Sequence, residues 1–197
     1  MNKVITISRE FGSGGRSIAN LVSEALGIPV FDNELLTRIA EESGFAKQYI
    51  EDNAENISLS HLISRSLSGL GGYNSFTPED YLWQSQSKVI IDIAEHEPCI
   101  IVGRCADYIL REKADCLRVF VYADKDKRAR RIVDVYGESP EGDPYARLKE
   151  KDKRRSTFYN YHTDMKWGEP HHYNICLDAG TLGLETCAEI IATIYRK

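Results

Sequence analysis

The stretch from Val4 to Ala19, VITISREFGSGGRSIA, decides the fold. It begins with a short apolar run typical of a buried strand, passes through a glycine-rich loop and ends in a helix-like run. Glycines at 12, 14 and 15 let backbone N–H groups approach an anion closely, and a helix start adds the positive end of its dipole. The order of strand, glycine-rich loop and helix therefore predicts a phosphate-binding loop.

The register of this loop has two interpretations. The P-loop pattern is Gly-x-x-x-x-Gly-Lys-Ser/Thr, in which Lys reaches the phosphates and the hydroxyl binds Mg²⁺. One alignment puts Arg16 at the Lys position and Ser17 at the hydroxyl position, with Glu10 in place of the first glycine. An alignment shifted by one residue puts Gly15 at the Lys position, so that positive charge must come from elsewhere. A turn that binds nothing is the third possibility.

Short apolar segments alternate with helical patterns along the rest of the chain, which is typical of an α/β fold with a parallel sheet. The pattern predicts a three-layer α/β/α fold in a single domain, 1–197, with about five parallel strands. Residues 44–77 and 137–170 interrupt the alternation and are interpreted as mobile insertions that close over a ligand. The expected strands are 3–7, 28–31, 98–102, 117–122 and 173–177, and the expected helices are 16–26, 33–43, 78–96, 104–112, 124–136, 143–163 and 183–196.

Composition narrows the class of protein. The net charge of −5 disfavours general nucleic-acid binding, and no apolar run approaches the length of a membrane span. A strand follows the first residues directly, so no signal peptide is expected. The five cysteines form no Cys-x-x-Cys pair, which indicates reduced thiols. The sequence predicts a soluble cytoplasmic protein without a membrane or nucleic-acid partner and leaves the oligomeric state open.

Positive charge is concentrated in one segment. Residues 125–155 contain 11 Lys and Arg against 7 Asp and Glu, although the whole chain is acidic. Arg128 and Arg131 are three apart and share a helix face, and four further cations form a stripe with Glu150 off it. Such a stripe is stabilised when an anion binds, although a solvated helix face is the alternative. The four cations are Arg147, Lys151, Arg154 and Arg155.

Two further groups are candidates for a site. An apolar run, Ile100–Val102, delivers Gly103 and Arg104 to the carboxyl end of a strand, where a guanidinium can grip a phosphate beside the first loop. The alternative for Arg104 is an ordinary surface arginine. Metal binding through His162, His171 and His172 is a much weaker hypothesis, because adjacent histidines point in different directions.

Taken in chain order, these segments resemble the cytidylate kinase-like family, a divergent branch of the P-loop nucleoside monophosphate kinases. The resemblance extends over nearly the whole chain and depends on the succession of motifs. It implies a P-loop NTPase fold with monophosphate-binding and lid insertions. Cys105 and Tyr122 depart from the family pattern, so the resemblance implies phosphate handling more strongly than recognition of cytosine. The segments that carry it are VITISREFGSGGRSIA, IPVFDNELL, CIIVGRCADYI, LRVFVYADKDKRARRI, EKDKRRS and YNICLDAGTLGLE.

The resemblance implies a role for each matching residue. The ATP phosphate loop would consist of Gly12, Ser13, Gly14, Gly15, Arg16 and Ser17, with Ser17 as the Mg²⁺ ligand. The acceptor site would include Asp32, Arg38, Arg104 and, two residues beyond the replaced aspartate, Asp107. The catalytic cations would be Arg16, Arg128, Arg131, Lys151, Arg154 and Arg155, the last three in the lid.

These roles imply a phosphotransferase that uses ATP and Mg²⁺ and phosphorylates a nucleoside monophosphate such as CMP or dCMP. Transfer to a phosphate dianion needs positioning and positive charge, and no general base. One alternative is a kinase of another small molecule or of a protein hydroxyl, which would want a base such as Asp32 or Asp107. The other alternative is a sensor that binds a nucleotide without turnover.

Overall fold

The central sheet has five parallel strands in the order β2-β3-β1-β4-β5. The computed structural model describes residues 3–47, 49–50, 77–135, 137 and 142–197. In the register of the sheet, Ile7 of β1 lies between Val102 of β3 and Val119 of β4. The three strands therefore end close together, and the loops that follow them share one edge of the sheet. The strands are β1 (Lys3–Arg9), β2 (Val30–Phe31), β3 (Cys99–Val102), β4 (Asp115–Tyr122) and β5 (Ile175–Asp178).

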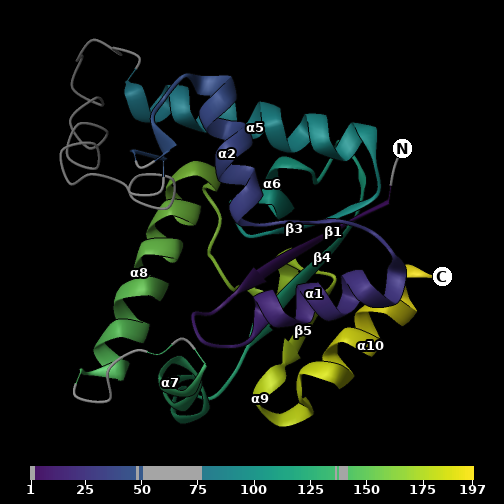
Figure 1. Ribbon diagram of the computed structural model, residues 1–197, viewed down its shortest axis with the longest axis vertical. Helices are drawn as coiled ribbons and strands as arrows, with labels where there is room; N and C mark the ends of the chain where they lie inside the picture. The colour runs from purple at the N-terminus through teal and green to yellow at the C-terminus, as the bar shows by residue number, and fades with distance from the viewer. Residues whose placement is uncertain (1–2, 48, 51–76, 136, 138–141) are drawn as a thin grey trace.

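Helices cover both faces of this sheet, which confirms the predicted three-layer α/β/α fold (Figure 1). One face carries α1 (Gly15–Leu26) and α10 (Leu184–Tyr195). The other face carries α2 (Asn33–Ser43), α5 (Pro78–His96) and α6 (Ala106–Ile109).

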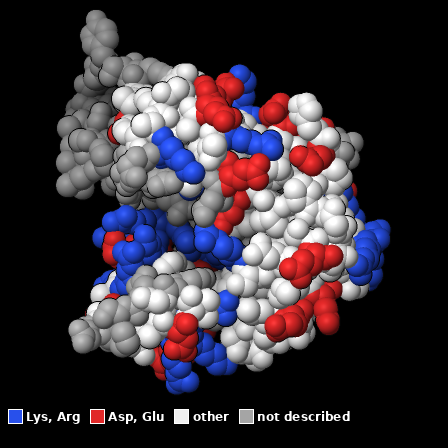
Figure 2. All heavy atoms as spheres, viewed as in Figure 1, with Lys and Arg blue, Asp and Glu red and all other residues white. Residues whose placement is uncertain are grey.

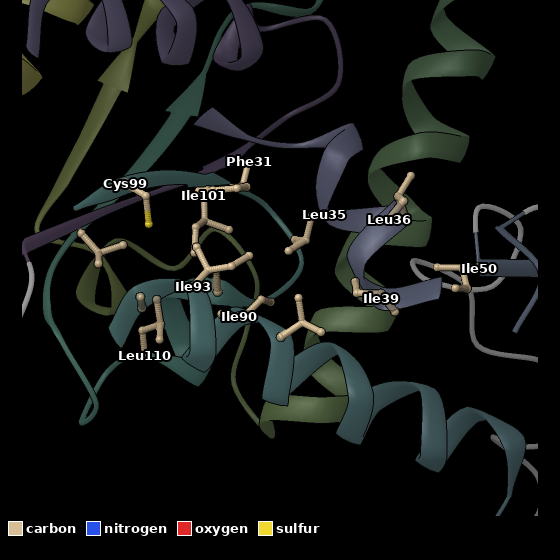
Figure 3. Close-up of a cluster of buried hydrophobic side chains, with 14 of the residues drawn as sticks. Phe31, Leu35, Leu36, Ile39, Ile50, Ile90, Ile93, Cys99, Ile101 and Leu110 are labelled. Atoms are coloured by element: carbon tan, nitrogen blue, oxygen red, sulfur yellow. The ribbon is translucent and has the colours of Figure 1, made fainter. Parts of the chain in front are cut away.

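Alternation along β1 divides the core into two halves. Val4 belongs to the cluster under α2 and α5, whereas Ile5 and Ile7 belong to the cluster under α1 and α10. Figure 3 shows the first cluster, in which Ile90 and Ile93 of α5 pack among side chains of α2 and of the sheet. Because successive residues of a strand point to opposite faces, a strand buried on both sides reads as a continuous apolar run.

The remaining helices flank the edge of the sheet where β1 and β3 end. The long α8 (Pro144–Thr163) stands beside α7 (Lys125–Asp134), on the left of Figure 1. Asp143 fixes the start of α8, since its carboxylate accepts the N–H groups of Tyr145 and Ala146. The short elements η1 (Pro170–His172) and α9 (Ala179–Leu182) flank β5 on either side in the sequence.

Two details of the predicted elements are wrong. The helix expected over 104–112 is confined to α6, because Arg104 and Cys105 adopt left-handed backbone conformations with φ of 58° and 54°. The short helix α9, whose cap is Asp178, is absent from the expected helices, and the last helix begins after Gly183. Of the insertion expected over 44–77, residues 48 and 51–76 lie outside the described residues.

The chemistry of the surface and of the thiols agrees with the composition. None of the helices that the structure describes is long and apolar enough to cross a membrane. All five cysteines are free thiols. The chain ends lie near each other on the right of Figure 1, where Lys3 Nζ donates to the carbonyl of Tyr195 at 2.6 Å.

Candidate active site

The glycine-rich loop joins the end of β1 to the start of α1. Gly12 and Gly14 have φ of 77° and 93°, a conformation that favours glycine, and Gly14 directly precedes the first helical residue. Ser13 is buried, and its hydroxyl donates to the carbonyls of Glu10 at 2.9 Å and Val121 at 3.2 Å. Its side chain therefore anchors the loop to the sheet, while the backbone remains in front of the N-terminus of α1.

A hollow of about 350 Å³ lies in front of this loop, and its lining is strongly cationic. Among the described residues of the lining, the only carboxylate is that of Glu10, whose Oε2 is already 3.3 Å from Arg128 Nε. Figure 2 shows Lys and Arg side chains gathered on the left of the molecule, in the region where Figure 1 places α8. The lining consists of Arg9, Glu10, Phe11, Gly12, Gly14, Gly15, Arg16, Arg147, Lys151 and Arg155.

One face of α8 closes the far side of the hollow. Of the predicted stripe, Arg147, Lys151 and Arg155 line the hollow, whereas Arg154 pairs with Glu150 at 2.6 Å. The expectation that Glu150 lies off the stripe is wrong, because its carboxylate also pairs with Arg147 at 3.2 Å. Three of the four predicted cations thus face the glycine-rich loop.

Burial, together with neighbouring cations, lowers the pKa of Lys151. Burial of the ammonium group is the main cause, and the positive charges of Arg147 and Arg154 add to it. A lysine whose charge is disfavoured in this way gains electrostatic stabilisation when an anion binds beside it. The lining of the hollow is therefore electrostatically complementary to a negatively charged group.

Arg128, predicted as a catalytic cation, lies inside the protein. Only 4% of it is exposed, and its guanidinium lies 3.3 Å from Glu10 Oε2 and 2.6 Å from Asp152 Oδ2. The same group donates to the carbonyl of Phe11 at 3.2 Å. Since two carboxylates already compensate its charge, Arg128 serves in this arrangement to join α7, α8 and the loop.

Glu10, the partner of Arg128, likewise has a structural role. Its Oε2 accepts the N–H of Ala123 at 3.2 Å in addition to its pairing with Arg128. Burial raises the pKa of Glu10, and the nearby Arg128 cation opposes that rise. Engaged on both sides, this carboxylate is poorly placed to act as a base toward a substrate in the hollow.

Arg131 and Ser17 occupy the place where the sequence predicts the Mg²⁺ ligand. Arg131 Nη2 donates to the Ser17 hydroxyl at 2.9 Å. A guanidinium and a divalent cation cannot share one hydroxyl oxygen without strong repulsion. Ser17 therefore does not fit as a metal ligand in this arrangement.

Arg16 turns away from the loop. Its Nε is hydrogen-bonded to Oδ2 of Asp32, which follows β2, and 53% of the side chain is exposed. Arg16 lines the hollow while its guanidinium is engaged with Asp32. The predicted acceptor residue Asp32 is joined to Arg16 and does not itself line the hollow.

A second and smaller hollow adjoins the first. Arg9 and Arg155 line both hollows, and Gly103, Arg104 and Tyr159 line only the second. Gln86 of α5 donates from its side chain to the carbonyl of Arg104 at 3.2 Å, which helps to hold the left-handed turn. The sequence-based placement of Arg104 beside the first loop agrees with this arrangement.

Asp107, predicted to bind substrate, is buried beneath the second hollow. Only 3% of it is exposed, and its carboxylate accepts the hydroxyls of Ser8 at 3.3 Å and Tyr159 at 2.8 Å. Burial raises the pKa of Asp107, and the hydrogen bonds from Tyr159 and Ser8 partly offset that effect. The residue is placed to position Tyr159 and β1 and lines neither hollow.

This burial gives a pH-dependent expectation for stability. Because the folded-state pKa of Asp107 lies above the ordinary value of 3.8, its stabilising contribution is complete below that value and is lost as the pH rises through the folded-state pKa. Relative to the wild type, Asp107→Asn should therefore gain stability as the pH rises. Urea unfolding of both proteins between about pH 4 and about pH 8 measures the difference. A difference that does not change with pH would contradict this expectation.

The remaining candidates lie apart from the two hollows. Arg38 stands over the ring of Phe31 at 4.7 Å and pairs with Glu34 at 3.5 Å. His162 stacks on Trp83, with ring centroids 4.2 Å apart. Within the described part of the chain, no group of three or more His, Cys, Asp or Glu residues could hold a metal ion.

Sequence reasoning missed three residues of the site. Arg9 lines both hollows, and Asp152 accepts the N–H of Phe11 at 2.7 Å in addition to pairing with Arg128. Glu10 was noted only as a missing glycine. The one signal for Arg9 was its position directly after a buried strand, at the start of the glycine-rich loop.

Comparison with known proteins agrees with this geometry. A family model described as "Cytidylate kinase-like family" matches residues 4–181. The chain belongs to the cytidylate kinase-like family. The match spans β1, the glycine-rich loop, α7 and α8, so both walls of the hollow belong to the family region. No curated protein matches the sequence.

The fold of this member of the cytidylate kinase-like family is similar to that of several solved structures, two of which are kinases. An uncharacterized protein from Eubacterium ventriosum is 26% identical, with a TM-score of 0.73 over 100% of this chain and 99% of that chain. A shikimate kinase from Bacteroides thetaiotaomicron is 13% identical, with a TM-score of 0.56 and 99% coverage of both chains. The APS kinase of Mycobacterium tuberculosis is 16% identical, with a TM-score of 0.55 over 100% of this chain and 98% of that chain. The last two similarities show the fold.

Proposed function

We propose that this member of the cytidylate kinase-like family is an ATP-dependent kinase that phosphorylates a nucleoside monophosphate, with CMP or dCMP as the first candidate. Family membership supports phosphoryl transfer. The cationic hollow in front of the glycine-rich loop supports an acceptor that itself carries a phosphate.

The observation that carries the proposal is the state of the carboxylates around the hollow. Glu10 is paired with Arg128, Asp32 with Arg16, and Asp107 is buried under Tyr159. A hydroxyl acceptor needs a base within hydrogen-bond reach, whereas a phosphate dianion attacks without one. Among the residues that the structure describes, cations are abundant and available bases are scarce, which favours a phosphate acceptor.

The residues of the chain have separate tasks in this proposal. The backbone N–H groups at Gly14 and Gly15, together with the N-terminus of α1, hold the phosphates of ATP. Lys151 and Arg155 stabilise the charge on the γ-phosphoryl group while its bond to the ADP oxygen breaks and its bond to the acceptor oxygen forms. Arg104 in the adjoining hollow binds the acceptor phosphate.

A panel of acceptors tests the proposal. The purified protein is incubated with ATP, Mg²⁺ and one of CMP, dCMP, UMP, AMP, GMP or water, and both ADP and the new diphosphate are quantified. ADP formation that depends on one monophosphate, with the matching diphosphate, is expected. ATP binding without turnover on any monophosphate would refute the proposal. Shikimate or gluconate, added as hydroxyl acceptors, then separate a hydroxyl kinase from a nucleotide sensor.

The lowered pKa of Lys151 predicts how ATP binding depends on pH. Lysine attracts the phosphates only while protonated, so ATP affinity should fall as the pH rises through the Lys151 pKa, which lies below the usual value of 10.5. In Lys151→Arg the charge persists, so this loss should shift to higher pH. ATP titrations between about pH 7 and about pH 10 measure both proteins. Parallel curves would show that Lys151 is not the titrating group.

A further inference from the structure

The side chain of Arg9 covers the first residue of α1. A Cβ atom at Gly15 would lie 2.7 Å from Arg9 Cβ and 2.9 Å from Arg9 Cγ, which no real side chain tolerates. The guanidinium end lies over Gly103, where a Cβ would overlap Arg9 Nη1. Gly15, at the start of α1, and Gly103, after β3, have no side chains, and the Arg9 side chain therefore fits over both of them.

The register of the loop indicates which P-loop residue Arg9 could replace. The P-loop pattern places its Lys directly after the second glycine, at the start of the helix. Gly14 is the left-handed residue before α1 and Gly15 is the first helical residue, so the Lys position of this chain is Gly15. In the same register Arg9 occupies the position of the first glycine, and Arg16 turns outward to Asp32.

We propose that Arg9 replaces the P-loop lysine, so that its guanidinium, lying over Gly15 and Gly103, contacts the β- and γ-phosphates of a nucleoside triphosphate. The proposal deepens the proposed function and rests on it for the identity of the nucleotide. Arg155 Nη1 donates to the Arg9 carbonyl at 3.1 Å, which fixes the backbone from which the side chain extends. Because a guanidinium forks, Arg9 can bind two phosphate oxygens through two parallel N–H···O hydrogen bonds, whereas the ammonium group of a lysine acts as a point charge.

Equilibrium binding of ATP, ADP and AMP to three proteins tests this role. Arg9→Met keeps the aliphatic contact over Gly15 and removes the charge, and Arg130→Met is the matched control, since Arg130 is exposed on α7 and lines neither hollow. Arg9→Met should weaken ATP and ADP binding about tenfold to a hundredfold and change AMP binding less than about threefold. The control should bind all three like the wild type. Thermal unfolding checks that each variant is folded.

A rescue variant separates charge from loop structure. Gly15→Lys alone should lose ATP affinity, because the new side chain meets Arg9. The double variant Arg9→Gly/Gly15→Lys puts the first glycine and the lysine of the P-loop pattern at positions 9 and 15, while Arg16 still occupies the hydroxyl position, and it should recover at least about tenfold over Arg9→Gly. This reversal of sign would not arise if Arg9 only supported the fold.

The outcomes of these binding experiments and of the acceptor panel distinguish the role of Arg9 from the proposed kinase function. The role of Arg9 is overturned if Arg9→Met binds ATP within about twofold of the wild type, if AMP binding falls equally, or if the wild type binds no ATP. ATP binding that depends on Arg9, without turnover on any monophosphate, refutes the proposed function and leaves Arg9 as the phosphate ligand.

Discussion

Replacing Arg155 with alanine should lower kcat/KM for ATP about a hundredfold to a thousandfold, the loss typical of removing one preorganised donor from a phosphoryl-transfer site. Arg155 lines both hollows and so stands between the proposed ATP and acceptor sites. It also donates to the Arg9 carbonyl at 3.1 Å, so its loss disturbs the loop in addition to removing charge. Steady-state rates with the acceptor identified by the panel measure the effect.

The same helix offers a matched control for this variant. Lys153 lies two residues away on α8 and is exposed outside the lining of the hollow. Lys153→Ala removes one positive charge from the same helix and should change kcat/KM less than about threefold. If Lys153→Ala and Arg155→Ala lost activity equally, the effect would come from the overall charge of α8 and the site assignment would be wrong.

Replacing Asp152 with alanine should produce the largest loss of stability, about 3 kcal/mol of unfolding free energy. The substitution removes one of the two carboxylates that compensate buried Arg128 and also the acceptor of the Phe11 N–H. A charge left buried without full compensation costs more than the pair contributed. Urea or thermal unfolding measures the loss, and ATP affinity should fall with it because Phe11 lies in the loop.

Glu150 is the control for Asp152. It is also an acidic residue of α8 in ion pairs with arginines, but its side chain and those of its partners are about 40% exposed. Glu150→Ala should therefore cost less than about 1 kcal/mol. A loss for Asp152→Ala as small as that for Glu150→Ala would show that Arg128 finds another partner or admits water.

The fold could be predicted because its signals are local. Apolar runs such as Cys99–Val102 are buried on both faces, and Pro98 separates α5 from β3 as the sequence indicates. The failures arose where the backbone departs from local preference. Arg104 and Cys105 were expected to begin a helix. Contacts such as that with Gln86 instead hold their backbone in a left-handed turn.

Residues of the site could be predicted only where the spacing of charged residues along one helix was sufficient to identify them. The stripe on α8 was recognised because Arg147, Lys151 and Arg155 recur at helical spacing. Arg128 has the same appearance in the sequence, but its carboxylate partners come from the loop and from α8, which no local pattern brings together. Arg9 was missed for a similar reason: the position of its side chain depends on Gly15 and on Gly103, which is far from Arg9 in the sequence.

The contacts between α8 and the loop also restrict changes in chain length. Asp152 accepts the N–H of Phe11 at 2.7 Å, and three residues later Arg155 donates to the carbonyl of Arg9 at 3.1 Å. The helix therefore binds the loop at two points. The distance between these two points is set by the helical rise between residues 152 and 155. One residue inserted between 152 and 155 would rotate one of these side chains by about 100° away from its partner. Relatives that keep this site should consequently vary in length before or after the segment 152–155, and not within it.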